Sequence, residues 1–183
     1  MHKLLALVLA ATAVLPLPNI SAADAQPRAY AAPRIDQLRA GRFLVTVFEG
    51  APADEWNARN SLSRGIRVFE RPRRSTFAAV AAQEIFEFDM KARGGPINKI
   101  DMEIVSHEIE SLVASRYGGF NLAAFEQKEA EMLTHYARFR GMSVGETVAR
   151  MRAARPFAER WLAQNRDVIR TLVNYSFPRY RQR

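Results

Sequence analysis

The sequence of 183 residues contains no cysteine. Disulfides, thiolate catalysis and cysteine-ligated metal sites are therefore excluded, whichever compartment the protein occupies. The chain also has no Gly-rich phosphate loop, no G-x-S-x-G elbow and no dinucleotide-binding fingerprint. These absences leave no signature of a nucleotide-binding enzyme or of a serine hydrolase.

Long hydrophobic runs are scarce, and the longest lies at the N-terminus over residues 4–17. It follows the basic start Met1-His2-Lys3 and precedes small residues with A-x-A spacing that end at Ala25. The run is too short to cross a bilayer, which needs about 20 apolar residues. This layout is typical of a secretory signal peptide over residues 1–25, cleaved after Ala25 or after Ala23. We therefore expect a periplasmic or secreted protein without a transmembrane segment.

Lysine is rare, with four residues, so arginine supplies most of the formal net charge of +8. The planar guanidinium group suits phosphate and carboxylate partners. Because the arginines are scattered, two interpretations remain open: attraction to an anionic envelope surface, or a basic surface with no particular partner. Nucleic-acid binding is not expected, since the chain carries an export signal and no recognition motif.

The composition, 48% hydrophobic and 25% charged, is that of a globular protein. We expect a single domain over residues 26–183, with a loose leader over 26–40 and a frayed basic tail over 179–183. Enrichment in β-branched and aromatic residues predicts a strand at 42–48, buried on both faces, and a second strand at 66–70. The polar stretch between them is expected to hold a short helix around 54–60.

From residue 75 the hydrophobic pattern has helical periodicity. Glycines mark the expected ends of helices, and the capping residues Asn121 and Ser143 mark the starts of two of them. Together they predict helices over 75–93, 98–117, 121–141 and 143–174, of which the last is expected to be interrupted at Pro156. The predicted fold class is therefore α+β. A small N-terminal antiparallel sheet of two or three strands is followed by a predominantly helical core of four or five helices.

The first predicted helix carries Gln83, Glu84 and Glu87 within an otherwise apolar stretch. Gln83 and Glu87 lie one turn apart, and Glu84 shares a stripe with Phe77 and Phe88, which predicts partial burial. A buried carboxylate is costly unless it is paired, hydrogen-bonded or bound to a cation. The alternative is an amphipathic helix whose narrow polar edge meets solvent.

The second predicted helix places Glu103, His107 and Glu110 on one face, at positions i, i+4 and i+7. His107 is a candidate metal ligand or proton shuttle near neutral pH. The apolar residues lie mostly on the opposite side, which favours a solvated polar face. Glu131 and His135 repeat the i, i+4 pairing, one residue longer than the Glu-x-x-His spacing of di-iron bundles.

The order of a strand, A-A-V-A-A-Q-E-I-F-E, a loop and S-H-E-I-E-S-L-V-A-S-R-Y resembles a zincin-type metallopeptidase of the glutamate-zincin branch, over about residues 66–117. In that family two histidines of H-E-x-x-H bind zinc, the glutamate between them is the general base, and the next helix adds an acidic ligand. The resemblance implies that Gln83 and Glu87 occupy the two histidine positions. It likewise implies that Glu84 occupies the position of the general base and Glu110 that of the acidic ligand.

Both histidine ligands of the family are thus replaced, and oxygen ligands bind zinc weakly compared with imidazole. Calcium or magnesium would accept such ligands better. The resemblance therefore implies a degenerate member that acts as a non-catalytic binding or regulatory module, with either no cofactor or a divalent metal. Two alternatives stay open: an active metal-dependent hydrolase using Glu84, Glu87, His107 and Glu110, and a helical adaptor that binds an envelope protein or an anionic surface.

Overall fold

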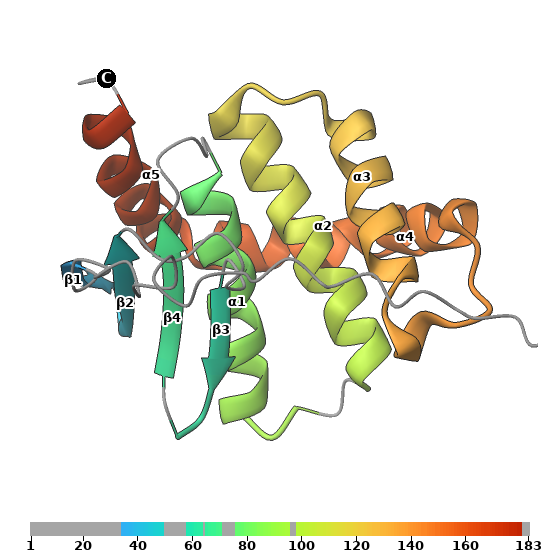
Figure 1. The fold of residues 1–183 in the computed structure, drawn as a ribbon, viewed down its shortest axis with the longest axis horizontal. Helices are drawn as coiled ribbons and strands as arrows, with labels where there is room; N and C mark the ends of the chain where they lie inside the picture. Colours follow the sequence, from blue (N-terminus) through green and yellow to red (C-terminus); the bar gives the residue numbers. More distant parts are fainter. Residues whose placement is uncertain (1–33, 50–57, 64, 71–75, 96–97, 181–183) are drawn as a thin grey trace, which may run out of the picture. The chain divides into compact units, whose positions relative to one another are not determined.

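The computed structural model describes residues 34–49, 58–63, 65–70, 76–95 and 98–180. All of them belong to one compact unit, Ala32–Arg183. Over this part of the chain a four-stranded sheet is followed by five α-helices and one short 3-10 helix, which confirms the predicted α+β class (Figure 1). The expected signal peptide at 1–25 lies outside the described residues, as does the end of the basic tail at 181–183.

The sheet contains β1 (Arg34–Ala40), β2 (Phe43–Glu49), β3 (Ala58–Ser61) and β4 (Gly65–Glu70), in the order β1-β2-β4-β3. β1 and β2 are antiparallel and joined by a tight turn in which Gly41 has a φ of +59°, a left-handed conformation that glycine adopts without a steric penalty. β3 is antiparallel to β4, but β2 and β4 are parallel. The sheet is therefore mixed and has four strands, not the expected two or three antiparallel ones. The difference arises because β3 lies at the edge of the sheet and is followed by β4, which inserts between β2 and β3. β4 is antiparallel to β3 and therefore runs parallel to β2.

Three local predictions for the N-terminal region are wrong. Residues 34–40 of the expected loose leader form β1, and residues 58–60 of the expected short helix belong to β3, while 54–57 lie outside the described residues. β2 is buried on one face only, because Phe43, Val45 and Val47 are buried while Leu44 is 44% exposed. This alternation matches a sheet that helices cover on one side.

The helices are α1 (Phe77–Ala92), α2 (Lys99–Gly118), α3 (Leu122–Thr134), α4 (Val144–Gln164) and α5 (Arg166–Tyr180). The caps predicted at Asn121 and Ser143 are confirmed, since these side chains accept hydrogen bonds from the first turns of α3 and α4, whereas Thr76 at the start of α1 makes no side-chain cap hydrogen bond. α3 ends earlier than expected, and a 3-10 helix over Ala137–Phe139 follows it. α4 is not interrupted at Pro156; the break falls at Asn165, where α5 begins one residue later.

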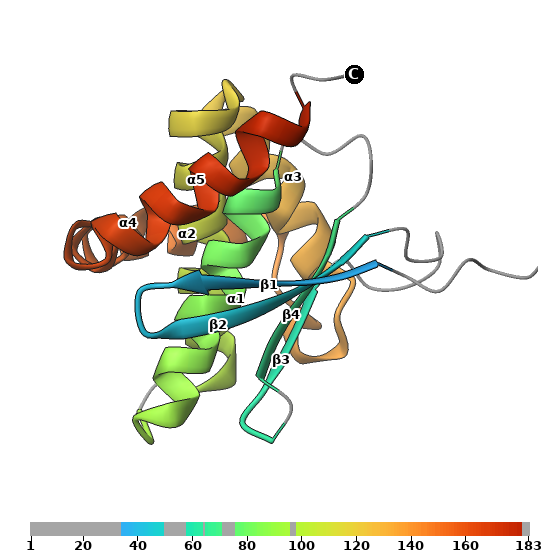
Figure 2. The same cartoon turned by 90° about the vertical axis from the view of Figure 1, so that its left-hand side faces the viewer.

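The helices form successive layers behind the sheet. α1 packs against β3 and β4 while α5 packs against β1, so that the two cover the same face (Figure 2). α2 packs against α1 and is also in contact with α3 and α4 (Figure 1). As a result every residue of α2 from Met102 to Ala114 is buried, including its charged ones. None of the described helices combines the length and hydropathy needed to span a membrane.

Candidate metal centre

Two polar residues of α1, Gln83 and Glu87, contact α2. Gln83, Glu84 and Glu87 are each between 6% and 9% exposed, so the predicted burial of Glu84 is confirmed and the alternative of a solvated polar edge is wrong. The Nε2 atom of Gln83 lies 3.3 Å from Nε2 of His107, and the Ser106 hydroxyl donates to Glu87 Oε1 at 3.1 Å. Gln83 also donates to Glu87 at 3.4 Å. The residues that the zincin resemblance placed at the histidine positions therefore contact the helix that follows them.

His107 lies at the centre of these contacts and is only 3% exposed. Its Nδ1 atom lies 2.8 Å from Glu129 Oε2 and 3.5 Å from Glu110 Oε2, and its Nε2 atom lies 3.7 Å from Glu103 Oε2. We call these four residues the His107 cluster. The predicted solvated face of α2 is thus wrong as well, because α1 and α3 pack against it.

The carboxylates determine the protonation of the ring. Burial alone would lower the pKa of His107, but hydrogen bonds to Glu103, Glu110 and Glu129 outweigh it and raise the pKa well above 6.5. Burial favours a higher pKa for Glu103, yet His107 and Arg138 bring the pKa below 4.5. Arg138 donates to Glu103 Oε1 at 2.6 Å from the surface side of the cluster. The ring is therefore an imidazolium at neutral pH unless another cation replaces its proton.

The same geometry is suited to a divalent metal ion. One ligand atom each from His107, Glu110 and Glu129 can be chosen so that all three lie within 4.8 Å of one another. An imidazole nitrogen with two carboxylate oxygens is a ligand set used for zinc and for other first-row metals. Among the described residues this converging group includes neither Glu87, which was expected as a metal ligand, nor Glu84, which was expected as the general base. Of the predicted metal ligands the structure thus brings His107 and Glu110 together, with Gln83 at the other ring nitrogen.

Glu129 was not among the ligands expected from the sequence. This residue lies on α3 at four-residue spacing from the buried residues Phe125 and Leu133. A carboxylate on an otherwise apolar stripe is the signal that could have identified it, by the argument used for Glu84. Glu131 on α3 and His135, the C-cap residue of this helix, have the more conspicuous spacing but are both exposed.

A second polar cluster lies beside the first, on another face of α2. Glu108 is fully buried and accepts a hydrogen bond of 2.7 Å from Arg155 Nε. Arg155 also donates to Glu126 on α3, which receives a further 2.9 Å hydrogen bond from Arg152. We call these four residues the Glu108 cluster. Burial raises the pKa of Glu108 to about 7 against the opposing effect of Arg155, and its Oε2 atom has no hydrogen-bond partner in the described structure.

Comparisons with family models, curated proteins and solved structures give no match to this chain.

Proposed function

We propose that this chain is an exported, non-catalytic binding module on a zincin-like scaffold, and that it holds one divalent metal ion at His107, Glu110 and Glu129. The observation that carries the proposal is the convergence of three buried ligand atoms within 4.8 Å. Carboxylates removed from water need a compensating charge, which a metal ion would supply in place of the ring proton.

The burial of these ligands supports a closed site. His107, Glu110 and Glu129 are between 3% and 6% exposed. Catalytic zinc sites keep one coordination position open to water or substrate, whereas structural sites are closed. Two surface pockets that the described residues form beside α5 are lined by other residues. A bound ion would therefore stabilise the packing of α3 on α2 and would have no access to a peptide bond.

The scaffold part of the proposal depends on the placement of α1. The two positions that would carry histidines in an active zincin, Gln83 and Glu87, lie at the contact between α1 and α2. Glu110, at the position of the acidic ligand, lies against His107 on α2. In a zincin these three positions converge on one metal ion, whereas here Glu110 lies at Nδ1 of His107 and Gln83 at Nε2, so on this scaffold the metal would have shifted toward α3. Export itself is supported by the signal-peptide pattern at residues 1–25.

Metal titration tests the proposal. We expect the purified, chelator-treated protein to bind one Zn²⁺ or Mn²⁺ per chain in isothermal titration calorimetry and to release protons on binding. A metal concentration 100 times the Kd should stabilise the fold by about 2.7 kcal/mol and raise its Tm. The variant Glu129→Gln should lose this effect, while Glu131→Gln, an exposed change on the same helix, should keep it.

Two results would contradict the proposal. Failure of the wild-type protein to bind either ion, with identical Tm values in metal and in chelator, would leave His107 as a buried imidazolium. Metal-dependent hydrolysis of peptides that Glu129→Gln abolishes would instead support the alternative of an atypical hydrolase.

A further inference from the structure

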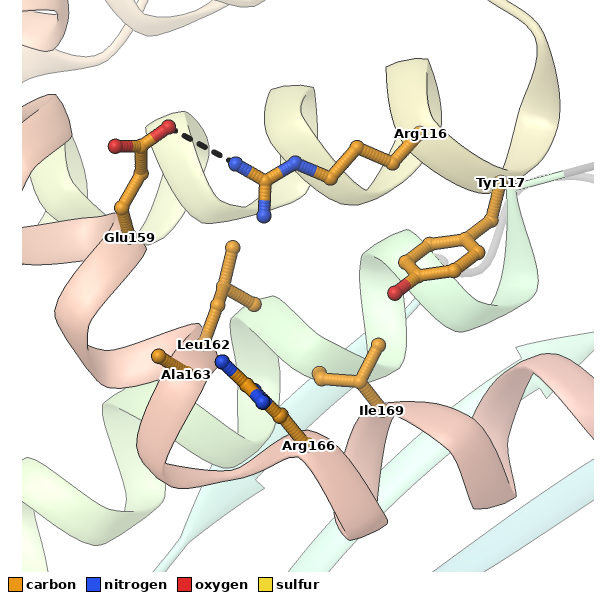
Figure 3. A pocket seen from close by; sticks show the side chains of 7 residues that line it. All are labelled: Arg116, Tyr117, Glu159, Leu162, Ala163, Arg166 and Ile169. Atoms are coloured by element: carbon orange, nitrogen blue, oxygen red, sulfur yellow. Dashed lines mark hydrogen bonds and ion pairs between the residues drawn. The ribbon is translucent and has the colours of Figure 1, made fainter.

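A surface pocket lies where the C-terminal end of α2 meets the junction of α4 and α5 (Figure 3). Its volume is about 190 Å³. A cavity of about 150 Å³ accommodates benzene, whereas drug-sized ligands need about 300 Å³ or more. The pocket is therefore the right size for one small group of atoms. It is lined by Arg116, Tyr117, Glu159, Leu162, Ala163, Arg166 and Ile169.

The lining combines an apolar floor with a charged rim. Leu162 and Ile169 are buried core residues, whereas Arg116, Tyr117 and Arg166 are exposed. Figure 3 shows the two guanidinium groups on opposite sides of Leu162, with the hydroxyl of Tyr117 pointing toward the space between them. Leu162 and Ile169 are only 6% and 3% exposed, so a group bound here would contact small exposed parts of these side chains on one side and hydrogen-bond donors on the other.

The rim has one positive charge in excess. Arg116 Nη2 lies 2.9 Å from Glu159 Oε1, and this ion pair offsets one of the two arginines. In the part of the chain that the structure describes, Arg166 has no ion-pair partner and the Tyr117 hydroxyl has no hydrogen-bond partner. Both are donors, and a planar guanidinium group forms its strongest hydrogen bonds with a carboxylate or a phosphate.

We propose that this pocket binds a carboxylate attached to a short branched apolar group, with the carboxylate at Arg166 and Tyr117 and the apolar group on Leu162 and Ile169. A free short carboxylic acid and an apolar residue at the carboxyl terminus of a peptide share this chemistry. The opening to solvent leaves room for the rest of a peptide. This pocket shares no residue with the metal centre, so the proposal of a carboxylate site does not depend on the proposed function.

An NMR titration with three probes tests the pocket in the ¹⁵N-labelled protein. N-acetyl-L-leucine should bind with a Kd on the order of 1 mM, given its size, and should shift the amide signals of Leu162 and Ile169. N-acetyl-L-leucinamide, which lacks the carboxylate, should bind at least tenfold more weakly. The third probe, 4-methylpentanoate, separates the two sources. Equal affinity indicates a site for free acids, and weaker binding than that of N-acetyl-L-leucine indicates a site for chain termini.

Two variants should change the affinity in opposite directions. Arg166→Gln removes the unpaired donor and should weaken the binding of N-acetyl-L-leucine about tenfold. Glu159→Gln removes the competing carboxylate, frees Arg116 and should strengthen binding about threefold. Arg150→Gln is the control for the loss of one exposed guanidinium group, because Arg150 lies on α4 outside the pocket, in an ion pair with Glu146.

Equal binding of the acid and the amide would overturn the proposal. So would unchanged affinity in Arg166→Gln, an equal loss in Arg150→Gln, or shifts that avoid Leu162 and Ile169. The opposite sign expected for Glu159→Gln keeps the test decisive even if Arg166→Gln perturbs the start of α5.

Discussion

His107 and Glu108 are consecutive residues of α2, yet they belong to two buried polar clusters that balance charge in different ways. In the Glu108 cluster two carboxylates face two guanidinium groups, which stay charged at any physiological pH. In the His107 cluster three carboxylates lie within 3.7 Å of one imidazole ring, whose charge depends on a proton. The cations of the Glu108 cluster are covalently attached, so only the proton of Glu108, whose pKa is raised to about 7, changes with pH there. The cation of the His107 cluster is itself a proton and can be exchanged. A metal ion can replace the proton of His107 but cannot replace an arginine.

The largest expected effect comes from removing a fixed cation. Arg155→Met leaves the buried carboxylates of Glu108 and Glu126 without a shared partner and should lower the free energy of unfolding by about 3 kcal/mol. Arg150→Met breaks an exposed ion pair on the same helix and should cost less than about 1 kcal/mol. Urea denaturation followed by circular dichroism measures both. Equal losses for the two variants would mean that the Glu108 cluster contributes no more than a surface pair.

A second prediction uses pH to separate the clusters. Because burial raises the folded-state pKa of Glu108 from 4.5 to about 7, the folded protein holds this proton to a higher pH than the unfolded chain does. The resulting stability is fully present below pH 4.5 and is lost as the pH rises through about 7. The stability of the wild type relative to Glu108→Gln should therefore fall by about 2 kcal/mol between pH 5 and pH 8.

The same measurement distinguishes the contribution of His107. Its pKa is also raised, so the stability that it provides is present below pH 6.5 and is lost only as the pH passes well above that value. This contribution is common to the wild type and Glu108→Gln and cancels in their difference. A difference that stays flat from pH 5 to pH 8 would show that Glu108 is ionised in the folded state throughout this range.

The elements that the sequence predicts correctly are those determined by local chemistry. Asn121 and Ser143 cap helices because each side chain reaches a backbone N–H three residues away. The direction of β4 was not predictable in this way, since it depends on the pairing of β3 with the outer edge of the sheet. Pro156 led to the wrong position for the helix break because the tertiary packing of α4 outweighs its unfavourable propensity.

In the candidate site, too, the features determined by local sequence were predictable and those determined by tertiary packing were not. Helical periodicity places Glu103, His107 and Glu110 on one face of α2, but it does not tell what packs against that face. A helix with one polar and one apolar face usually packs its apolar face in the core and exposes its polar face to water. α2 differs because α1, α3 and α4 all pack against it. Glu129 and Arg155 become partners of α2 only through the docking of α3 and α4, so no spacing within one segment identifies them.

The smallest expected change in the free energy of unfolding tests whether the polar contacts of the His107 cluster extend to α1. The buried hydroxyl of Ser106 donates to the carboxylate of Glu87, so Ser106→Ala should lower the free energy of unfolding by about 1 kcal/mol. Ser111→Ala, equally buried on α2, removes only a bond to the backbone carbonyl of His107 and should cost less than about 0.5 kcal/mol. Urea denaturation of the two variants measures the difference. If the two losses are equal, the carboxylate of Glu87 does not depend on α2, and the polar contact between α1 and α2 is separable from the proposed metal centre. A larger loss of unfolding free energy for Ser106→Ala would show that Glu87 on α1 is coupled to the face of α2 that carries the His107 cluster. The Glu108 cluster involves only α2, α3 and α4.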